Sequence, residues 1–323
     1  SWLGAKQIVI GNMSTGNLMS FFTYIMQILS SLMMLSMVFV MITMSRASAE
    51  RIVEVLDEES DITNCDNPVY EVKDGSVEFT DVSFSYAKRP DKTVLDDIDL
   101  IIPSGQTVGI IGGTGSSKSS LVQLIPRLYD VTGGCVKVGG IDVRNYDLQT
   151  LRHNVAMVLQ KNTLFSGTIK ENLHWGNPEA TDEELVHACK LAQADDFIRT
   201  FPDGYDTYIE QGGTNVSGGQ KQRLCIARAI LRKPKILILD DSTSAVDTKT
   251  DALIRQAFRE EIPNTTKIII AQRISSVRAA DRILILEEGR MAGFGTHEEL
   301  MASAPVYRQL YESQTGQKGD ETA

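Results

Sequence analysis

The longest apolar run in the chain lies near its N-terminus, where no residue from Leu18 to Met44 carries a charge. As a helix rising about 1.5 Å per residue, this run would extend about 40 Å, which exceeds the bilayer hydrocarbon core of about 30 Å. Arg46 and Arg51 follow directly, and such residues mark the cytoplasmic end of a span. The pattern predicts a transmembrane helix over 18–44 with a cytoplasmic extension to residue 56. A buried helix of a soluble protein is the alternative.

Serine, threonine and glutamine side chains interrupt this run. Polar groups within a span usually face other helices or a water-filled cavity. We therefore expect residues 1–56 to be the end of a larger membrane domain.

Beyond residue 56 the hydrophobic period changes. Residues 57–74 are acidic and contain Asn and Pro, which predicts a linker, and Val77, Phe79, Val82 and Phe84 then alternate with polar residues as in a half-buried strand. A second strand is expected over 94–102. Short continuous apolar runs, which are typical of buried parallel strands, follow at Thr107–Ile111, Ile236–Leu239, Lys267–Ala271 and Arg282–Leu286.

Helix-like segments alternate with these strands, over Ser119–Leu128 and Gln220–Arg232. Thr296 and Glu299 form a capping box that opens a terminal helix. Residues 313–323 are polar and predicted to be disordered. Residues 75–312 are thus predicted to be an α/β nucleotide-binding domain with an antiparallel β subdomain and a helical subdomain, preceded by one transmembrane helix.

Composition narrows the possible partners and the compartment. The formal net charge of −10 argues against a nucleic-acid backbone as the main partner. The four cysteines, at 65, 135, 189 and 225, form no CxxC pair, so reduced thiols are expected rather than a zinc site or a disulfide framework. The chain begins at Ser1 without a signal-peptide layout, which reads as a piece of a longer protein.

A glycine-rich stretch after the apolar run Thr107–Ile111 has the pattern of a phosphate-binding P-loop. Its residues are Gly112, Gly113, Thr114, Gly115, Ser116, Ser117, Lys118, Ser119 and Ser120. Small residues let backbone N–H groups crowd around phosphate oxygens, Lys118 supplies a point charge, and the Ser119 hydroxyl can ligate Mg²⁺. A glycine-rich turn with a chance lysine is the alternative. Ser117 stands where the pattern usually has glycine.

The run Ile236–Leu239 ends in two carboxylates, Asp240 and Asp241. In P-loop enzymes such a strand brings an aspartate to the Mg²⁺ shell, and we assign Asp240 to that role. Asp241 then stands where a general base would face the attacking water. Acidic residues that merely cap a strand are the alternative.

Upstream, Val216 is followed by Ser217, Gly218, Gly219 and Gln220, which open the basic helix Gln220–Arg232. With the P-loop and the carboxylate strand, this sequence resembles an ATP-binding cassette (ABC) transporter of the exporter type. The resemblance implies that two cassettes pack head to tail, so that each signature covers the γ-phosphate held by the other. It also implies six membrane helices per subunit, of which 18–44 is the last.

The resemblance carries further residue roles. Tyr86 corresponds to the aromatic that stacks on adenine, and Gln160 to the glutamine that touches the metal and senses the membrane domain. Leu164–Ile169 with Glu171 and Asn172 resembles a stretch typical of exporters, and Ser244–Asp247 resembles the loop that communicates between the two sites, with Asp247 as its acid.

Departures from the family pattern fall at the catalytic positions. Asp241 replaces the usual catalytic glutamate, and Gln272 replaces the switch histidine, which removes an ionisable group. Residues 209–213 also differ from the usual pattern before the signature. An intact signature beside two altered catalytic residues resembles the degenerate-site subunit of a heterodimeric multidrug-type exporter.

The resemblance therefore implies an ATPase-coupled membrane transporter that binds ATP and Mg²⁺ in the cytoplasm and exports a small molecule, lipid or peptide with a second half-transporter in the cell membrane. Its own site is expected to hydrolyse ATP slowly. A soluble cassette acting on ribosomes or DNA, a P-loop kinase and a homodimeric ATP-gated sensor are the alternatives.

Overall fold

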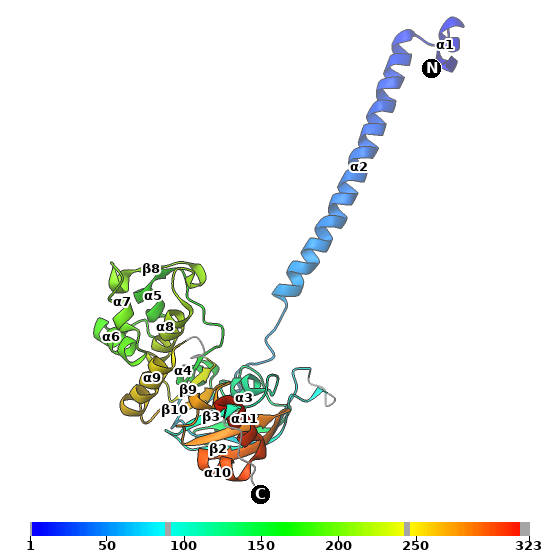
Figure 1. Ribbon diagram of the computed structural model, residues 1–323. Coiled ribbons are helices and arrows are strands. Elements are labelled where there is room, and N and C mark those ends of the chain that lie inside the picture. Colours follow the sequence, from blue (N-terminus) through cyan, green and yellow to red (C-terminus); the bar gives the residue numbers. More distant parts are fainter. Residues whose placement is uncertain (1, 88–91, 242–245, 317–323) are drawn as a thin grey trace. The chain divides into compact units, whose positions relative to one another are not determined.

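The computed structural model describes residues 2–87, 92–241 and 246–316, and it divides into two compact units, Ser1–Asp61 and Ile62–Ala323. The first unit contains α1 (Trp2–Val9) and α2 (Thr15–Leu56) (Figure 1). Helix α2 begins at an N-cap, where Ser14 Oγ accepts from the Asn17 N–H at 3.1 Å. It includes the predicted span and the predicted extension in one helix, and it is long and apolar enough to cross a membrane.

Polar side chains in α2 find partners inside the helix. The hydroxyls of Thr23, Ser31 and Ser36 donate to the carbonyl oxygens four residues earlier, at 2.9–3.0 Å. Such bonds let hydroxyls lie in an apolar helix without a partner helix. These three side chains therefore do not by themselves require neighbouring helices.

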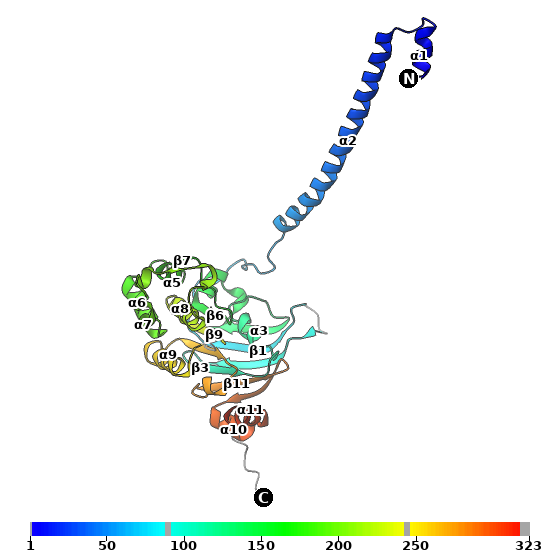
Figure 2. The ribbon, with the colours of Figure 1, turned by 45° about the horizontal axis from the view of Figure 1, so that its top comes forward.

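The second unit is built on a six-stranded sheet in the order β12-β11-β3-β10-β9-β6 (Figures 1 and 2). The inner neighbours pair in parallel, and β12 pairs antiparallel with β11. The strand bounds are β3 (Thr107–Ile111), β6 (Val155–Val158), β9 (Ile236–Asp240), β10 (Thr266–Ile270), β11 (Arg282–Glu287) and β12 (Arg290–Gly295). The continuous apolar runs predicted to be buried parallel strands are therefore confirmed.

Both faces of this sheet are covered, which explains why the middle of its inner strands is apolar on both faces. Along β9, Leu237 and Leu239 belong to one hydrophobic core, whereas Ile236 and Ile238 belong to the other. The first core includes the helical part of the unit. The second core includes the antiparallel sheet and α3 (Lys118–Leu124).

The antiparallel sheet has the order β2-β1-β4-β5 and confirms the predicted β subdomain. Its strands are β1 (Val77–Phe84), β2 (Leu95–Ile102), β4 (Gly133–Val138) and β5 (Ile141–Asp142). The apolar residues of β1 are buried, and a register shift between Phe79 and Val82 keeps both halves of the strand facing the core.

A helical part follows β6 in the sequence and lies to one side of the sheets in Figure 1. It contains β7 (Gly167–Thr168), α5 (Ile169–His174), α6 (Asp182–Leu191), α7 (Asp195–Ile198), η3 (Gly204–Asp206), β8 (Tyr208–Ile209), η4 (Gln211–Gly213) and α8 (Gly218–Ile230). The remaining helices are η2 (Val143–Asn145), α4 (Leu148–Asn154), α9 (Thr248–Glu261), η5 (Ile274–Ser276), α10 (His297–Ser303) and α11 (Pro305–Thr315).

Several boundaries differ from the sequence prediction by a few residues, as for α8, which spans Gly218–Ile230 rather than 220–232. Helix α3 ends at Leu124 rather than Leu128, because the chain turns at Arg127, whose φ of 51° is left-handed. Helix α11 continues through Ser313 to Thr315, past the predicted start of the disordered tail. The predicted capping box at Thr296 is present, since Thr296 and Glu299 bond reciprocally.

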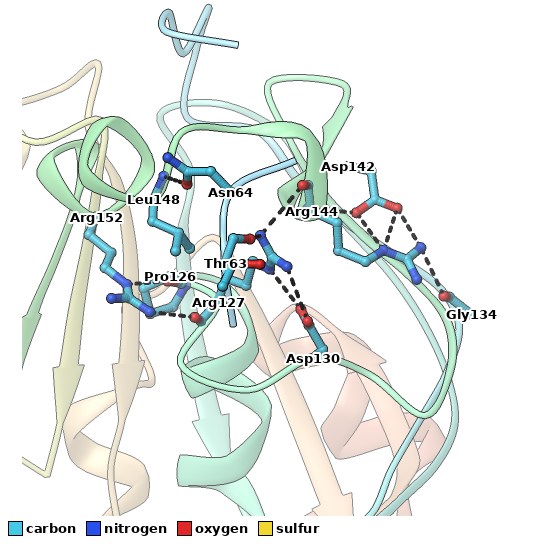
Figure 3. Close-up of polar contacts among 10 residues, drawn as sticks. All are labelled: Thr63, Asn64, Pro126, Arg127, Asp130, Gly134, Asp142, Arg144, Leu148 and Arg152. Carbon is cyan, nitrogen blue, oxygen red and sulfur yellow. Dashed lines mark hydrogen bonds and ion pairs between the residues drawn. The ribbon is translucent and has the colours of Figure 1, made fainter. Parts of the chain in front are cut away.

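Residues 62–69, hereafter the strap, belong to the second unit although the sequence placed them in a linker. Figure 3 shows the guanidinium of Arg127, which donates to Asp130 at 2.8 and 3.1 Å and to the Thr63 carbonyl oxygen at 3.1 Å. Arg127 is only 6% exposed. Asn64 accepts from the Leu148 N–H at 2.9 Å. The strap is therefore bonded both to the Arg127 side chain and to the start of α4.

Candidate functional site

The parallel strands bring the predicted site residues to one edge of the sheet. The loop after β3 begins at Gly112, β9 ends at Asp240, and Gln160 and Gln272 follow β6 and β10 closely. Because the carboxyl ends of parallel strands meet at one edge, residues far apart in sequence become neighbours there.

The glycine-rich stretch forms a tight loop whose lysine folds across it. Lys118 Nζ donates to the carbonyl oxygens of Gly112 and Gly113 at 2.9 and 2.7 Å and to Ser116 Oγ at 3.1 Å. Burial lowers the pKa of Lys118, while the Asp240 and Asp241 charges raise it. A cation held near a loop of small residues and a helix start is suited to bind phosphate.

Two positions show what this loop demands of the sequence. A Cβ at Gly112 would lie 2.1 Å from the Leu286 carbonyl oxygen, so only glycine fits there. Ser117, the off-pattern residue, is the N-cap of α3 with φ 69° and ψ 21°, which is the left-handed region. Glycine adopts this conformation without steric cost, whereas serine is strained by about 1–2 kcal/mol. The departure at 117 is therefore a strained position.

Asp240 and Ser119 form a pair suited to Mg²⁺. Asp240 is 7% exposed, and its carboxylate accepts a hydrogen bond from Ser119. Burial raises the pKa of Asp240, and Ser119 and Lys118 lower it. Carboxylate and hydroxyl oxygens are the ligand types that Mg²⁺ takes, and a nearby dication would relieve the cost of burying this charge.

Asp241 is held by two amides. Its Oδ2 accepts from Gln272 Nε2 at 2.8 Å and from Gln160 Nε2 at 3.4 Å. Burial and the neighbouring Asp240 raise the pKa of Asp241, and both amides and Lys118 oppose the rise. The structure thus brings Asp241, Gln272 and Gln160 together, as the sequence analysis expected for one site.

Tyr86 lies beside the P-loop helix. Its hydroxyl is 2.9 Å from Ser120 Oγ, and its ring packs edge-on against Phe84 and Tyr129, with centroids at 4.8 and 5.0 Å. The side chain remains 51% exposed, which leaves part of the ring available for stacking. Tyr129 was not singled out in the sequence, since a lone aromatic after a helix carries no signal of its own.

The signature residues lie in the helical part, apart from α3 and the P-loop (Figure 1). Ser217 Oγ accepts from the Gln220 N–H at 3.3 Å, and Gln220 Oε1 accepts from the Ser217 N–H at 2.8 Å. Gly218 and Gly219 form the first turn of α8 inside this capping box. This helix start is therefore a second turn of small residues, separate in sequence from the chain's own P-loop.

Asp247 caps α9 by accepting from the Thr250 N–H at 3.0 Å. The backbone hydrogen bond from Thr250 holds the pKa of Asp247 below its usual range. Ser244 and Ala245, the first half of the predicted communication loop, lie outside the described residues.

A groove of about 310 Å³, lined in part by Leu159 and Lys161 on either side of Gln160 in the sequence, was missed by the sequence analysis. Phe165 and Trp175 line it with ring centroids 4.9 Å apart and are 47% and 67% exposed. Arg228 also lines the groove, and its guanidinium lies over the Phe165 ring at 6.0 Å. Exposed paired aromatics mark a contact surface, and their separation in sequence hides it from pattern analysis.

Comparison with known proteins finds relatives of this chain. Residues 95–244 match the sequence profile of the family described as ABC transporter. The chain is 40% identical over 312 residues to the ABC transporter ATP-binding protein YknU of Bacillus subtilis, covering 96% of this chain and 53% of YknU. It is 40% identical over 307 residues to the fatty acid ABC transporter ATP-binding/permease protein of Mycobacterium bovis, covering 95% and 48%.

A solved structure is similar over nearly the whole chain. It is a bacterial Atm1-family ABC exporter with ATP bound, with a TM-score of 0.82 and 32% identity over 94% of this chain and 53% of that chain. The chain spans about half the length of these relatives.

Proposed function

Because this chain contains the ATP-binding domain of an ABC transporter, with a fold like that of an Atm1-family exporter, we propose that it couples MgATP binding and hydrolysis to export across a membrane. The P-loop, residues 112–120, would hold the phosphates, with Tyr86 against the adenine. Ser119, Asp240 and Gln160 would hold Mg²⁺, which neutralises charge on the phosphates. Helix α2 would be the last span of the membrane domain, and the second unit would lie in the cytoplasm.

The chain's own site is proposed to bind MgATP and to hydrolyse it slowly. The hydrogen bond from Gln272 to Asp241, at 2.8 Å, carries this inference. With Gln160 on the same oxygen, Asp241 Oδ2 is already an acceptor for two amides, and Gln272 can donate to a phosphate but cannot carry a proton. The aspartate is also one methylene shorter than glutamate, and a displacement of about 1 Å can cost about a hundredfold in rate.

The competent site is proposed to lie between this chain and a second half-transporter. The first turn of α8, with Ser217, Gly218, Gly219 and Gln220, would cover the γ-phosphate held by the partner. Asp247 would lie at the same dimer contact. The groove at Phe165 and Trp175 would receive a segment of the membrane domain. The cargo would be a small molecule, a lipid or a peptide.

ATPase measurements test this proposal. The chain in detergent is expected to bind MgATP but turn it over slowly alone, and to support faster hydrolysis with its half-transporter partner. The double variant Asp241→Glu and Gln272→His should raise turnover of the chain's own site by up to about a hundredfold. Gln256→His is the matched control, since Gln256 lies on α9 and bonds only Glu260 in the described contacts. Full hydrolysis by the unaltered chain alone would contradict the degenerate-site proposal.

A further inference from the structure

The loop that carries Gln272 is held from outside the nucleotide site by the last helix of the domain. Gln272 follows β10, and its side chain donates to Asp241. Ile274, two residues later, opens η5 and is buried. The first N–H of a helix has no partner within the helix, so the Ile274 N–H needs an acceptor from elsewhere.

Gln314, near the end of α11, supplies that acceptor. Its Oε1 accepts from the Ile274 N–H at 2.8 Å, and its Nε2 donates to the Gln272 carbonyl oxygen at 2.9 Å. One side-chain amide therefore bonds backbone groups on both sides of Arg273. The glutamine amide offers both the donor and the acceptor that this arrangement needs, whereas a glutamate carboxylate is acceptor-only when ionised.

Helix α11 is itself held in place, and this fixes the position of the Gln314 amide, whose two hydrogen bonds to the loop of Gln272 are hereafter called the clamp. Tyr307 on α11 is fully buried in the same core as Ile274, and its hydroxyl is 2.7 Å from His297 Nδ1 on α10. Arg308 donates to the carbonyl oxygens of Met301 and Ala302 at 2.8 and 3.1 Å. These contacts hold α11 in place, and the Gln314 side chain at its other end bonds the loop of Gln272.

We propose that Gln314 is a positioning residue for nucleotide recognition: it fixes the backbone of Gln272 so that the Gln272 amide faces the terminal phosphate of ATP. The inference rests on the proposed function, since it requires MgATP at the P-loop beside Asp240 and Asp241. The β-phosphate and the adenine are held by the P-loop and Tyr86, which Gln314 does not touch. The clamp therefore favours ATP over ADP rather than nucleotide in general.

The test is the ratio of affinities for MgATP and MgADP, measured by equilibrium binding to the full chain in detergent. Gln314→Met keeps a similar length and removes both hydrogen bonds. Losing two neutral hydrogen bonds should reduce the preference for ATP by about fivefold to 150-fold, with ADP affinity unchanged. Gln314→Glu should also reduce the preference, because its carboxylate faces the Gln272 carbonyl oxygen.

Arg308→Met is the matched control, because it loosens α11 from α10 without touching the loop of Gln272. It is expected to lower the melting temperature and to leave the ATP-to-ADP ratio unchanged. An unchanged ratio in Gln314→Met, or an equal shift in Arg308→Met, would overturn the inference. If the unaltered chain does not bind MgATP, the proposed function fails first and the inference falls with it.

Discussion

Replacing Arg127 by Met is expected to release the strap from the ATP-binding domain. Methionine keeps most of the apolar stem and removes every donor of a side chain that is 8% exposed. The variant loses the bidentate hydrogen bonds to Asp130 and the hydrogen bond to the Thr63 carbonyl oxygen. Hydrogen bonds to charged groups contribute about 1.5–3 kcal/mol each, but Asp130 is 36% exposed and water will solvate it. We therefore expect a loss of about 2–3 kcal/mol in the free energy of unfolding.

Thermal unfolding and hydrogen exchange of the full chain in detergent measure this effect. For a domain of this size, the expected loss corresponds to a fall of about 4–12 °C in melting temperature. The Val69 N–H, which donates to the Asn145 carbonyl oxygen at 2.8 Å, should exchange faster, because it lies in the released strap.

Arg144→Met is the matched control within Figure 3. Its guanidinium is 44% exposed and pairs with Asp142, two residues away, so the expected loss is below about 1 kcal/mol. The reasoning is refuted if Arg127→Met melts within about 2 °C of the unaltered chain, or if both variants lose equal stability. In either case the burial of Arg127 would not make its contribution to stability larger than that of Arg144.

Two further changes test local parts of the structure. Ser117→Gly should relieve left-handed strain, and because glycine also loses more entropy on folding, the free energy of unfolding should rise by at most about 1 kcal/mol; denaturant unfolding with Ser116→Gly as control measures it. Burial and Arg278 hold the pKa of His297 below its usual 6.5, against Glu298. The contribution of His297 to stability is therefore present above pH 6.5 and is lost as the pH falls through the lowered pKa. On acidification, the melting temperature of His297→Gln should drop less than that of the unaltered chain. A steeper drop in that variant would contradict the assignment.

The fold was largely predictable because its signals are local. The period of two in Val77–Phe84 and the short apolar runs that became β9, β10 and β11 each depend on how a strand buries one or two faces. The P-loop was predictable for the same reason, since a strand, a glycine-rich turn and a helix start are adjacent in sequence. The order of the strands in the sheet was not, because it depends on pairings between distant residues.

Side chains that act across long sequence distances were the ones that pattern analysis missed. Residues 62–69 lie in the predicted linker 57–74, which was assigned because that stretch is acidic and contains Asn and Pro, yet Arg127 bonds Thr63 from 64 residues away. Gln314 was assigned to a disordered tail because that tail is polar, although its amide bonds the loop that carries Gln272. A polar side chain has no periodic pattern, and its partner is visible only in three dimensions.

Asp241 and Gln272 are best understood as one altered unit, in keeping with the proposed slow site. An aspartate alone would leave a histidine that still titrates between about pH 5 and 8, and a glutamine alone would leave a longer carboxylate able to reach the attacking water. Together they form a neutral amide bonded to a short carboxylate at 2.8 Å. Such a pair can hold phosphate oxygens through the amide at any physiological pH while giving water no well-placed base. We therefore attribute the proposed slow turnover to both changes together.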